Sequence, residues 1–191
     1  MTASYPTTLK LTPLKEVTKK EGARLIERDG WLVAEAYTDL ESEVAAASQG
    51  LAIADTGANG KIWIEGQHTE HLIREVFHKE MPTIGNGVTA GTAGLYRLRR
   101  DMFFVTTTPM ATAAIVEALA RRIDTVQSFV TITDMTHGHG EICILGPCAR
   151  LLLSKVCALD LGHQRSDGCQ AWQTSVARTG QLLIHEQVCG S

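Results

Sequence analysis

The sequence Gly-Lys-Ile-Trp-Ile-Glu-Gly at residues 60–66 decides the fold, because its pattern returns as Gly-Glu-Ile-Cys-Ile-Leu-Gly at residues 140–146. Each copy follows an aspartate and a glycine-containing loop. The aspartates, Asp55 and Asp134, lie 79 positions apart, and the two heptapeptides lie 80 positions apart. A second loop that is longer by one residue explains the difference. The sequence therefore predicts an internal duplication of one supersecondary unit.

Each copy continues into an apolar helix pattern and then into two short strand-like runs around a polar turn. In the first copy a further helix begins at Thr108-Pro109, an N-cap residue followed by the proline favoured at the first helical position. Ile115, Leu119 and Ile123 recur every four residues along it. Its counterpart would begin near Cys189. The predicted fold class is α+β, a duplicated βαββα unit whose antiparallel sheets are covered by helices.

The predicted organisation has three parts. Residues 1–52 form an N-terminal helix and hairpin segment, residues 53–130 the first βαββα repeat, and residues 131–191 a second repeat that lacks its final helix. In the first part, Asp29-Gly30 between two apolar runs favours a tight hairpin. Residues 53–107 and 132–187 are expected to superpose about a pseudo-twofold axis.

Alternate apolar positions predict a buried strand face in both copies. The residues expected to point into the core are Ile62, Ile64, Ile142 and Ile144. Without a final helix, the second copy should leave an apolar sheet face for another surface to cover, and a partner subunit is the favoured candidate. That face is expected to include some of Val176, Leu182 and Ile184.

Composition excludes several classes of protein. The chain has 191 residues, of which 44% are hydrophobic, so it can bury an ordinary core. Eighteen basic and twenty-one acidic residues give a formal charge of -3, which predicts neither nucleic acid nor an anionic membrane as a partner. No membrane-spanning run and no signal-peptide core are found, so a cytoplasmic protein is expected. Five cysteines without a C-x-x-C pair predict reduced thiols.

The residues alone give no evident catalytic set. His137-Gly138-His139 with Cys143 suggests a metal site, but the ligand pattern is incomplete and favours a polar turn, so no metal is predicted. Gly85-Asn86-Gly87 lacks the third glycine of a dinucleotide-binding loop. Asp55 and Asp134 hold the same place in each copy, which favours the capping of loop amides over acid-base chemistry.

Two polar stretches have local interpretations. Arg97, Arg99 and Arg100 cluster on the first hairpin, where they either pair with an acidic ligand or partner or form a solvated hairpin edge. The solvated edge is favoured. Thr38-Asp39-Leu40-Glu41 has the spacing of a capping box at a helix start.

Several stretches resemble one superfamily, the folate-dependent aminomethyltransferases typified by the glycine cleavage T-protein together with the γ subunit of heterotetrameric sarcosine oxidase. Those similar to the T-protein are Thr12-Pro13-Leu14, Gly22-Ala23-Arg24, Gly30-Trp31 and residues 50–55, Gly-Leu-Ala-Ile-Ala-Asp. Those that look more like the γ subunit are residues 132–136, 145–147, 157–161 and 173–177. The resemblance spans nearly the whole chain.

The chain departs from the T-protein where that family carries its chemistry. An Asn-Asp pair after the first repeat's helix supplies the T-protein's carboxylate beside the folate, and the matching positions here are His78 and Lys79, with Glu80 adjacent but displaced. A lysine cannot stabilise the developing cation of an aminomethyl transfer. Arg178-Thr179-Gly180 resembles the motif before the family's later pterin-binding glutamate, but the expected Tyr-Thr-Gly-Glu continuation is absent.

Two hypotheses follow from the resemblance. The first is a non-catalytic γ-type subunit that packs against a larger flavoprotein subunit or against itself. The resemblance implies that the other subunits carry flavin and NAD and demethylate sarcosine oxidatively, with tetrahydrofolate as acceptor. The second is a small folate-binding protein or residual aminomethyltransferase, in which Glu80, Tyr96 and Arg178 contact tetrahydrofolate.

Overall fold

The computed structural model of this chain describes residues 8–126, 129–158, 169–176 and 179–186. They fall into two compact units. Unit 1 contains residues 1–58 and 136–148, and unit 2 contains residues 59–135 and 149–191. The described residues form twelve strands and five helices. None of these helices is both long enough and apolar enough to cross a membrane.

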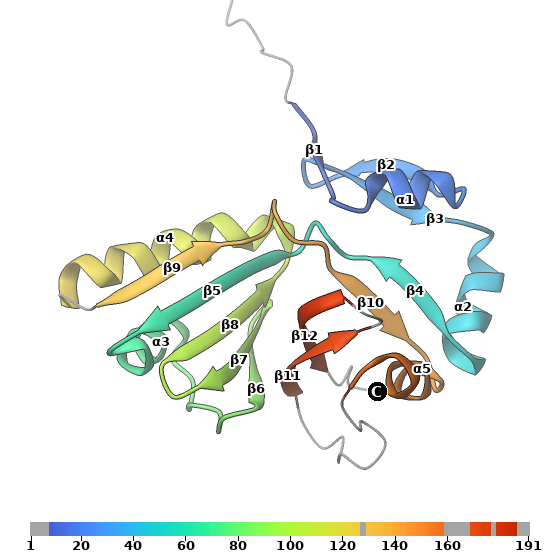
Figure 1. Cartoon of the computed structure of the whole chain (residues 1–191). Coiled ribbons are helices and arrows are strands. Elements are labelled where there is room, and N and C mark those ends of the chain that lie inside the picture. The colour runs from blue at the N-terminus through green and yellow to red at the C-terminus, as the bar shows by residue number, and fades with distance from the viewer. Residues whose placement is uncertain (1–7, 127–128, 159–168, 177–178, 187–191) are drawn as a thin grey trace, which may run out of the picture. The chain divides into compact units, whose positions relative to one another are not determined.

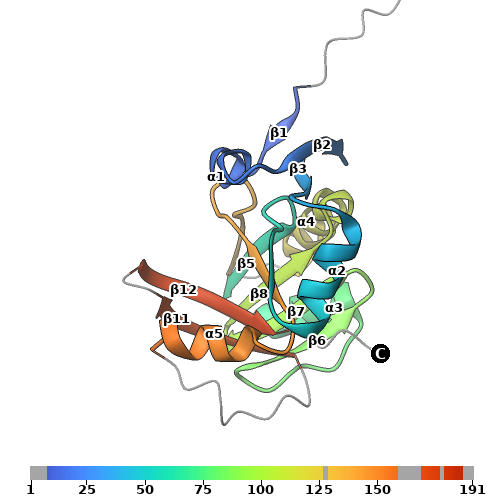
Figure 2. The same ribbon diagram turned by 90° about the vertical axis from the view of Figure 1, so that its right-hand side faces the viewer.

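Unit 2 is organised around one seven-stranded antiparallel sheet with the strand order β12-β11-β6-β7-β8-β5-β9 (Figure 1). Its strands are β5 (Gly60–Gly66), β6 (Asn86–Ala90), β7 (Ala93–Arg99), β8 (Met102–Thr107), β9 (Val130–Asp134), β11 (Cys169–Val176) and β12 (Thr179–Glu186). Its helices are α3 (Thr69–Phe77), α4 (Pro109–Val126) and α5 (Ala149–Val156). The β11–β12 hairpin, prominent in Figure 2, forms one edge of this sheet.

One face of the seven-stranded sheet packs against α3 and α4. The alternating pattern of β5 and β7 points Ile62, Ile64 and Leu95 to this side, where each is 0% exposed. Leu72 of α3 and Leu119 of α4 complete the contact. Burying side chains of this size contributes about 1.5 to 3 kcal/mol each, so this layer is the main core of unit 2.

Helix α4 packs closely against the start of β5, at a position that requires glycine. The helix begins at Pro109, as predicted, and a Cβ atom at Gly60 would collide with Thr112 in its first turn. Ile115 and Ile123 pack against the same core as Leu119, as their spacing predicts. A side chain at Gly60 would therefore separate the helix from the sheet.

Unit 1 holds a three-stranded sheet, in the order β1-β3-β2, and a two-stranded antiparallel sheet of β4 and β10. Its strands are β1 (Lys10–Leu11), β2 (Arg24–Arg28), β3 (Trp31–Ala36), β4 (Ala52–Asp55) and β10 (Ile142–Leu145), and its helices are α1 (Lys15–Lys20) and α2 (Leu40–Gln49). The β2–β3 hairpin turns at Asp29 and Gly30, which have φ values of 54° and 76°. Positive φ at both turn residues is what an Asp-Gly hairpin needs, and this prediction is confirmed.

The β4–β10 pair of unit 1 and the β9–β5 pair of unit 2 have the same register. The opposed residues are Asp55 with Ile142 and Ile53 with Ile144 in unit 1, and Asp134 with Ile62 and Ile132 with Ile64 in unit 2. Every member of the first pair corresponds to a member of the second through the 79-residue or 80-residue offset. This correspondence supports the interpretation of an internal duplication for these strands.

A hydrogen bond beside each pair follows the same correspondence. The Thr56 amide donates to the Glu141 carbonyl oxygen at 3.0 Å in unit 1, and the Met135 amide donates to the Lys61 carbonyl oxygen at 2.8 Å in unit 2. Asp55 also accepts hydrogen bonds from the Gly57 amide at 2.8 Å and from the Thr12 hydroxyl at 2.6 Å. The capping role predicted for Asp55 is therefore confirmed.

The correspondence stops at the hairpins. In the first copy, β8 pairs with both β7 and β5. Its predicted counterpart β12 pairs with β11 and forms the edge of the unit 2 sheet, whereas β10, the counterpart of β5, pairs with β4. The expected superposition of residues 53–107 and 132–187 is thus wrong beyond the first two strands, because β11 pairs with β6 instead and extends the first hairpin's sheet. The fold class itself is confirmed: the chain is α+β, with antiparallel sheets and helices.

The isoleucines predicted to lie in the core have different environments. Ile62 and Ile64 are completely buried, which confirms the prediction for them. Ile142 is 55% exposed, so the prediction is wrong for this residue, and Ile144 is partly buried. Of the residues expected on an uncovered face, only the Ile184 side chain is described, as partly buried, and those of Val176 and Leu182 lie outside the described part of the chain.

Candidate functional site

The face of the seven-stranded sheet opposite α3 and α4 carries the candidate site. Directly opposed residues of antiparallel strands point to the same side, so the register places side chains in rows across this face. The middle row is Trp63, Phe104 and Tyr96, and the rows beside it are Lys61, Thr106 and Gly94 on one side and Thr131, Glu65, Met102 and Arg99 on the other.

The middle row is a packed aromatic layer. The rings of Trp63 and Phe104 lie 6.2 Å apart at 62°, and those of Tyr96 and Phe104 lie 6.5 Å apart. A Cβ atom at Gly87 would lie 2.5 Å from the Tyr96 ring, so glycine there makes room for it. Tyr96 is 0% exposed and packs with Ala171 of β11. Only Trp63, which is partly buried, offers accessible aromatic surface in this row.

A buried cation lies in one flanking row. Lys61 is only 4% exposed, and its Nζ donates to the Asn59 carbonyl oxygen at 2.6 Å. The buried Lys61 side chain is thus held by local hydrogen bonding at the start of β5.

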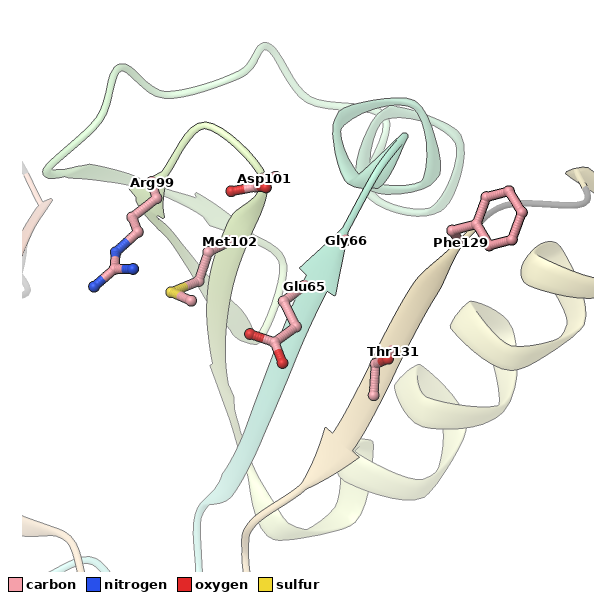
Figure 3. Close-up of a pocket in the computed structure, with 7 residues that line it drawn as sticks. All are labelled: Glu65, Gly66, Arg99, Asp101, Met102, Phe129 and Thr131. Atoms are coloured by element: carbon pink, nitrogen blue, oxygen red, sulfur yellow. The ribbon is translucent and has the colours of Figure 1, made fainter.

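The other flanking row opens into a pocket of about 400 Å³. Figure 3 shows its lining residues, Glu65, Gly66, Arg99, Asp101, Met102, Phe129 and Thr131. The Trp63 Nε1 donates to Glu65 Oε2 at 3.3 Å, which joins the aromatic row to the pocket. The exposed side chains of Glu65 and Asp101 give the pocket two carboxylate acceptors, and Arg99 gives it one forked cationic donor. Such a set suits a ligand with an amino edge and a carboxylate.

The arginine cluster of the first hairpin is divided between two roles. Arg97 pairs with Glu70 of α3, donates to the Arg100 carbonyl oxygen at 2.9 Å, and lies 5.5 Å over the Phe103 ring. Its side chain is 13% exposed, so the solvated-edge interpretation is wrong for Arg97. Arg99 and Arg100 are exposed, as that interpretation predicts.

The histidines of the 137–139 stretch do not gather metal ligands within the described residues. His137 stacks on Trp31, with ring centroids 5.0 Å apart and an interplanar angle of 20°. Among the residues that the structure describes, no group of three or more His, Cys, Asp or Glu side chains is placed to hold a metal ion.

The sequence of this chain matches the family model described as the GCVT N-terminal domain over residues 14–184. That match covers most of the chain. The chain belongs to the GCVT N-terminal domain family.

Relatives of this GCVT-type domain include an aminomethyltransferase of Rubrobacter xylanophilus, 28% identical over 91% of this chain and 50% of the relative. An aminomethyltransferase of Listeria monocytogenes is 23% identical over 81% of this chain and 45% of the relative. The chain therefore spans about half the length of the curated relatives it matches.

The solved structures that share the fold include the two that follow. The glycine cleavage system aminomethyltransferase T of Bartonella henselae has a TM-score of 0.69 at 18% identity, over 77% of this chain and 43% of that one. A chain of the heterotetrameric sarcosine oxidase of Corynebacterium sp. U-96, in complex with pyrrole 2-carboxylate, has a TM-score of 0.59 at 20% identity, over 75% of each chain.

The GCVT-type domain places its sequence-predicted folate residues in different environments. Glu80 is exposed in the loop that follows α3, whereas Tyr96 is completely buried and presents no accessible surface. Arg178 lies outside the described residues. His78 ends α3 with a φ of 51°, and His78 and Lys79 are both exposed. The structure therefore does not bring Glu80 and Tyr96 onto one surface.

The sequence pattern gave no signal for Glu65, and it named Arg99 only as a member of the arginine cluster. They are 34 positions apart in the chain and line the same pocket because both are in register with Met102.

Proposed function

We propose that this GCVT-type chain is a non-catalytic γ-type subunit of a cytoplasmic, sarcosine-oxidase-like complex. In such a complex the oxidative demethylation of sarcosine takes place on other subunits, which carry the flavin and NAD, and tetrahydrofolate accepts the one-carbon unit. This chain supplies packing surface to a larger flavoprotein subunit.

The observation that carries the proposal is the cation at position 79. Lys79 stands where the T-protein resemblance requires the carboxylate beside the folate, and it is exposed just past the end of α3. A positive charge there opposes a developing cation, so the chain lacks the electrostatic stabilisation that an aminomethyl transfer needs. Glu80 is also exposed and lies outside the helices and strands, in the loop after α3.

Surface chemistry supports an interaction role. Ile53 and Ile142 are each 55% exposed on the β4–β10 sheet, and Val17 is 56% exposed on α1. Clustered apolar exposure of this kind is typical of a surface that a partner covers. The fold similarity to a chain of a heterotetrameric oxidase supports the same assignment.

The test is co-expression of this chain with the products of adjacent reading frames for a flavin-binding oxidase. We expect co-elution on size exclusion, sarcosine oxidation by the complex, and none by this chain alone. Lys79→Ala should leave the activity of the complex unchanged, because the proposal gives Lys79 no catalytic part. A stable monomer that associates with none of these products, or a complex inactivated by Lys79→Ala, would count decisively against the proposal.

A second candidate function, folate binding, is favoured by the pocket at Glu65. The pterin's amino group and ring N–H would donate to a carboxylate such as Glu65, and a glutamyl carboxylate would accept from Arg99. The Glu80, Tyr96 and Arg178 set remains part of this alternative, and contact with Tyr96 requires that β11 move away from it. Calorimetry with tetrahydrofolate tests it: Arg99→Gln should reduce the heat and Arg100→Gln should not. No heat at millimolar tetrahydrofolate would eliminate this candidate.

A further inference from the structure

An apolar hollow on the β4–β10 sheet is lined by residues of both strands and of α1. We call it the β4–β10 groove. It has a volume of about 310 Å³, and its lining includes Leu14, Val17, Tyr37, Ile53, Asp55 and Ile142. Ile53 and Ile142 are 55% exposed and Val17 is 56% exposed, so large apolar side chains meet solvent around it. A cluster of exposed apolar side chains is typical of a binding site.

The register identifies what kind of element fits this groove. In unit 2 the corresponding face of β5 and β9 is covered by α4, and Ile62, which corresponds to Ile142, is 0% exposed. The covering stripe consists of Ile115, Leu119 and Ile123, spaced by four residues. Two sheet faces with the same residues in the same register present the same ridges and grooves. The groove therefore has the shape to receive a helix with an apolar stripe of that spacing.

The charge around the groove restricts the helix further. Asp55 and Glu21 lie in its lining, and both are acidic. Burial first, and then the carboxylates of Asp55, Glu21 and Glu43, raise the pKa of the Tyr37 hydroxyl above its ordinary value. A negative surrounding of this kind favours basic side chains beside the apolar stripe of the occupant.

We propose that the β4–β10 groove binds an amphipathic helix of a second polypeptide, through apolar side chains spaced by four residues and flanked by lysine or arginine. The helical form of the occupant follows from the register. Its origin in a second polypeptide rests on the proposed function.

The probe is a fluorescein-labelled peptide of residues 108–126 of this chain, which contains Ile115, Leu119 and Ile123 with Arg121 and Arg122 beside them. Fluorescence anisotropy with the full chain should show saturable binding below about 1 mM.

Ile53→Glu places a charge in the groove and should weaken binding about tenfold or more. The matched control is Leu151→Glu, at a leucine that is 57% exposed on α5 outside the groove, and it should change binding less than about twofold. A peptide with Leu119→Glu should not bind.

Circular dichroism and thermal unfolding establish that both variants fold. If Ile53→Glu does not fold, Val17→Glu replaces it, since Val17 is equally exposed on the groove's other side. No binding to 1 mM, or equal effects of Ile53→Glu and Leu151→Glu, overturns the inference. Sedimentation that shows a dimer of this chain, lost in Ile53→Glu, overturns it too, because the occupant is then a second copy.

The inference and the proposed function fail separately. A complex with the oxidase subunit that forms equally well with Ile53→Glu keeps the proposed function and removes the groove as its docking site. Groove-specific peptide binding without any complex keeps the helix site and removes the proposed function.

Discussion

Ile62 and Ile142 occupy corresponding positions in two strand pairs of identical register, yet Ile62 is completely buried and Ile142 is 55% exposed. Each lies directly opposite an aspartate, Asp134 for Ile62 and Asp55 for Ile142. The difference therefore does not come from local structure. It comes from α4, whose Leu119 packs in the core beside Ile62, whereas Ile142 lines the β4–β10 groove.

Truncating these two isoleucines should have unequal effects on stability. Ile62→Ala removes atoms from a filled core and should lower the free energy of unfolding by about 2 to 5 kcal/mol. Ile142→Ala removes atoms that already meet water and should cost less than about 0.5 kcal/mol. Urea denaturation of both variants measures the difference, and each serves as the other's control. Equal losses would show that the burial of these residues is assigned wrongly.

Gly66 and Gly146 form a second corresponding pair, with φ values of 127° and 109°. A Cβ atom at Gly66 would collide with the Phe129 carbonyl oxygen, and one at Gly146 would lie 2.5 Å from the Gly50 carbonyl oxygen. Gly66→Ala combines backbone strain with this collision and should cost about 3 kcal/mol or more. Gly91→Ala is the control: its φ is 62° with open space around it, so only the left-handed penalty of about 1 to 2 kcal/mol applies. A Gly66→Ala variant as stable as Gly91→Ala would contradict the close approach.

The sequence pattern predicted the elements whose signals are local. The Asp29-Gly30 turn, the start of α4 at Pro109 and the buried face of β5 are all confirmed, because turn chemistry, capping and alternation act within a few residues. The same pattern could not distinguish Ile142 from Ile62. Whether an apolar strand residue is buried depends on whether a helix from elsewhere in the chain packs over it. The alternation of apolar residues carries no information about that helix.

Strand β6 shows how a tertiary contact overrides a local signal. Gly85-Asn86-Gly87 has the composition of a loop, but β6 begins at Asn86 and pairs along β7. Gly87 pairs with Tyr96 of β7, and the Tyr96 ring fills the space that a side chain at position 87 would need. The pocket at Glu65 and Arg99 was hidden for a related reason, since only the pairing of both strands with β8 brings these residues to the same pocket.

Acid should weaken the start of α2. Asp39 is its N-cap and accepts from the Ser42 amide at 2.9 Å, and this bond, followed by that from the Ser42 hydroxyl, lowers the pKa of the Asp39 carboxyl. Glu43 reaches back to the Thr38 and Tyr37 amides, which lower its pKa as well. The capping box predicted at Thr38 and Glu41 is therefore wrong: the N-cap is Asp39, the residue three positions later is Ser42, and Glu43 accepts from amides that precede the N-cap. Because a depressed pKa means that the folded state holds the charged form, this stabilisation is present above the unfolded pKa and is lost as the pH falls through the folded pKa.

The measurement is an NMR titration of the Ser42 and Thr38 amides across the carboxyl range. Their shifts should titrate below the ordinary pKa of Asp and Glu, and helix signals of α2 should weaken at the same pH. Asp39→Asn is the matched control, because asparagine caps about as well as aspartate but does not titrate. An Asp39→Asn variant whose α2 start keeps the full acid dependence would assign that dependence to Glu43 alone.

Arg97 ties α3 to the β7–β8 hairpin, and its loss should cost more than the loss of its ionic partner. The guanidinium lies over the Phe103 ring and donates to the carbonyl oxygens of Arg99 at 3.3 Å and Arg100 at 2.9 Å in addition to Glu70. Arg97→Met removes all of these and should lower the free energy of unfolding by about 1 to 3 kcal/mol. Glu70→Gln leaves the ring contact and both carbonyl acceptors in place, and Glu70 is 42% exposed, so its cost should be about 1 kcal/mol or less.

Denaturation at low and high salt separates the two contributions, since salt screens the pair with Glu70 and leaves the packing of Arg97 on Phe103 largely unchanged. If Arg97→Met and Glu70→Gln lose the same stability and salt removes both losses, the ion pair alone holds α3 to the hairpin and the ring contact contributes nothing.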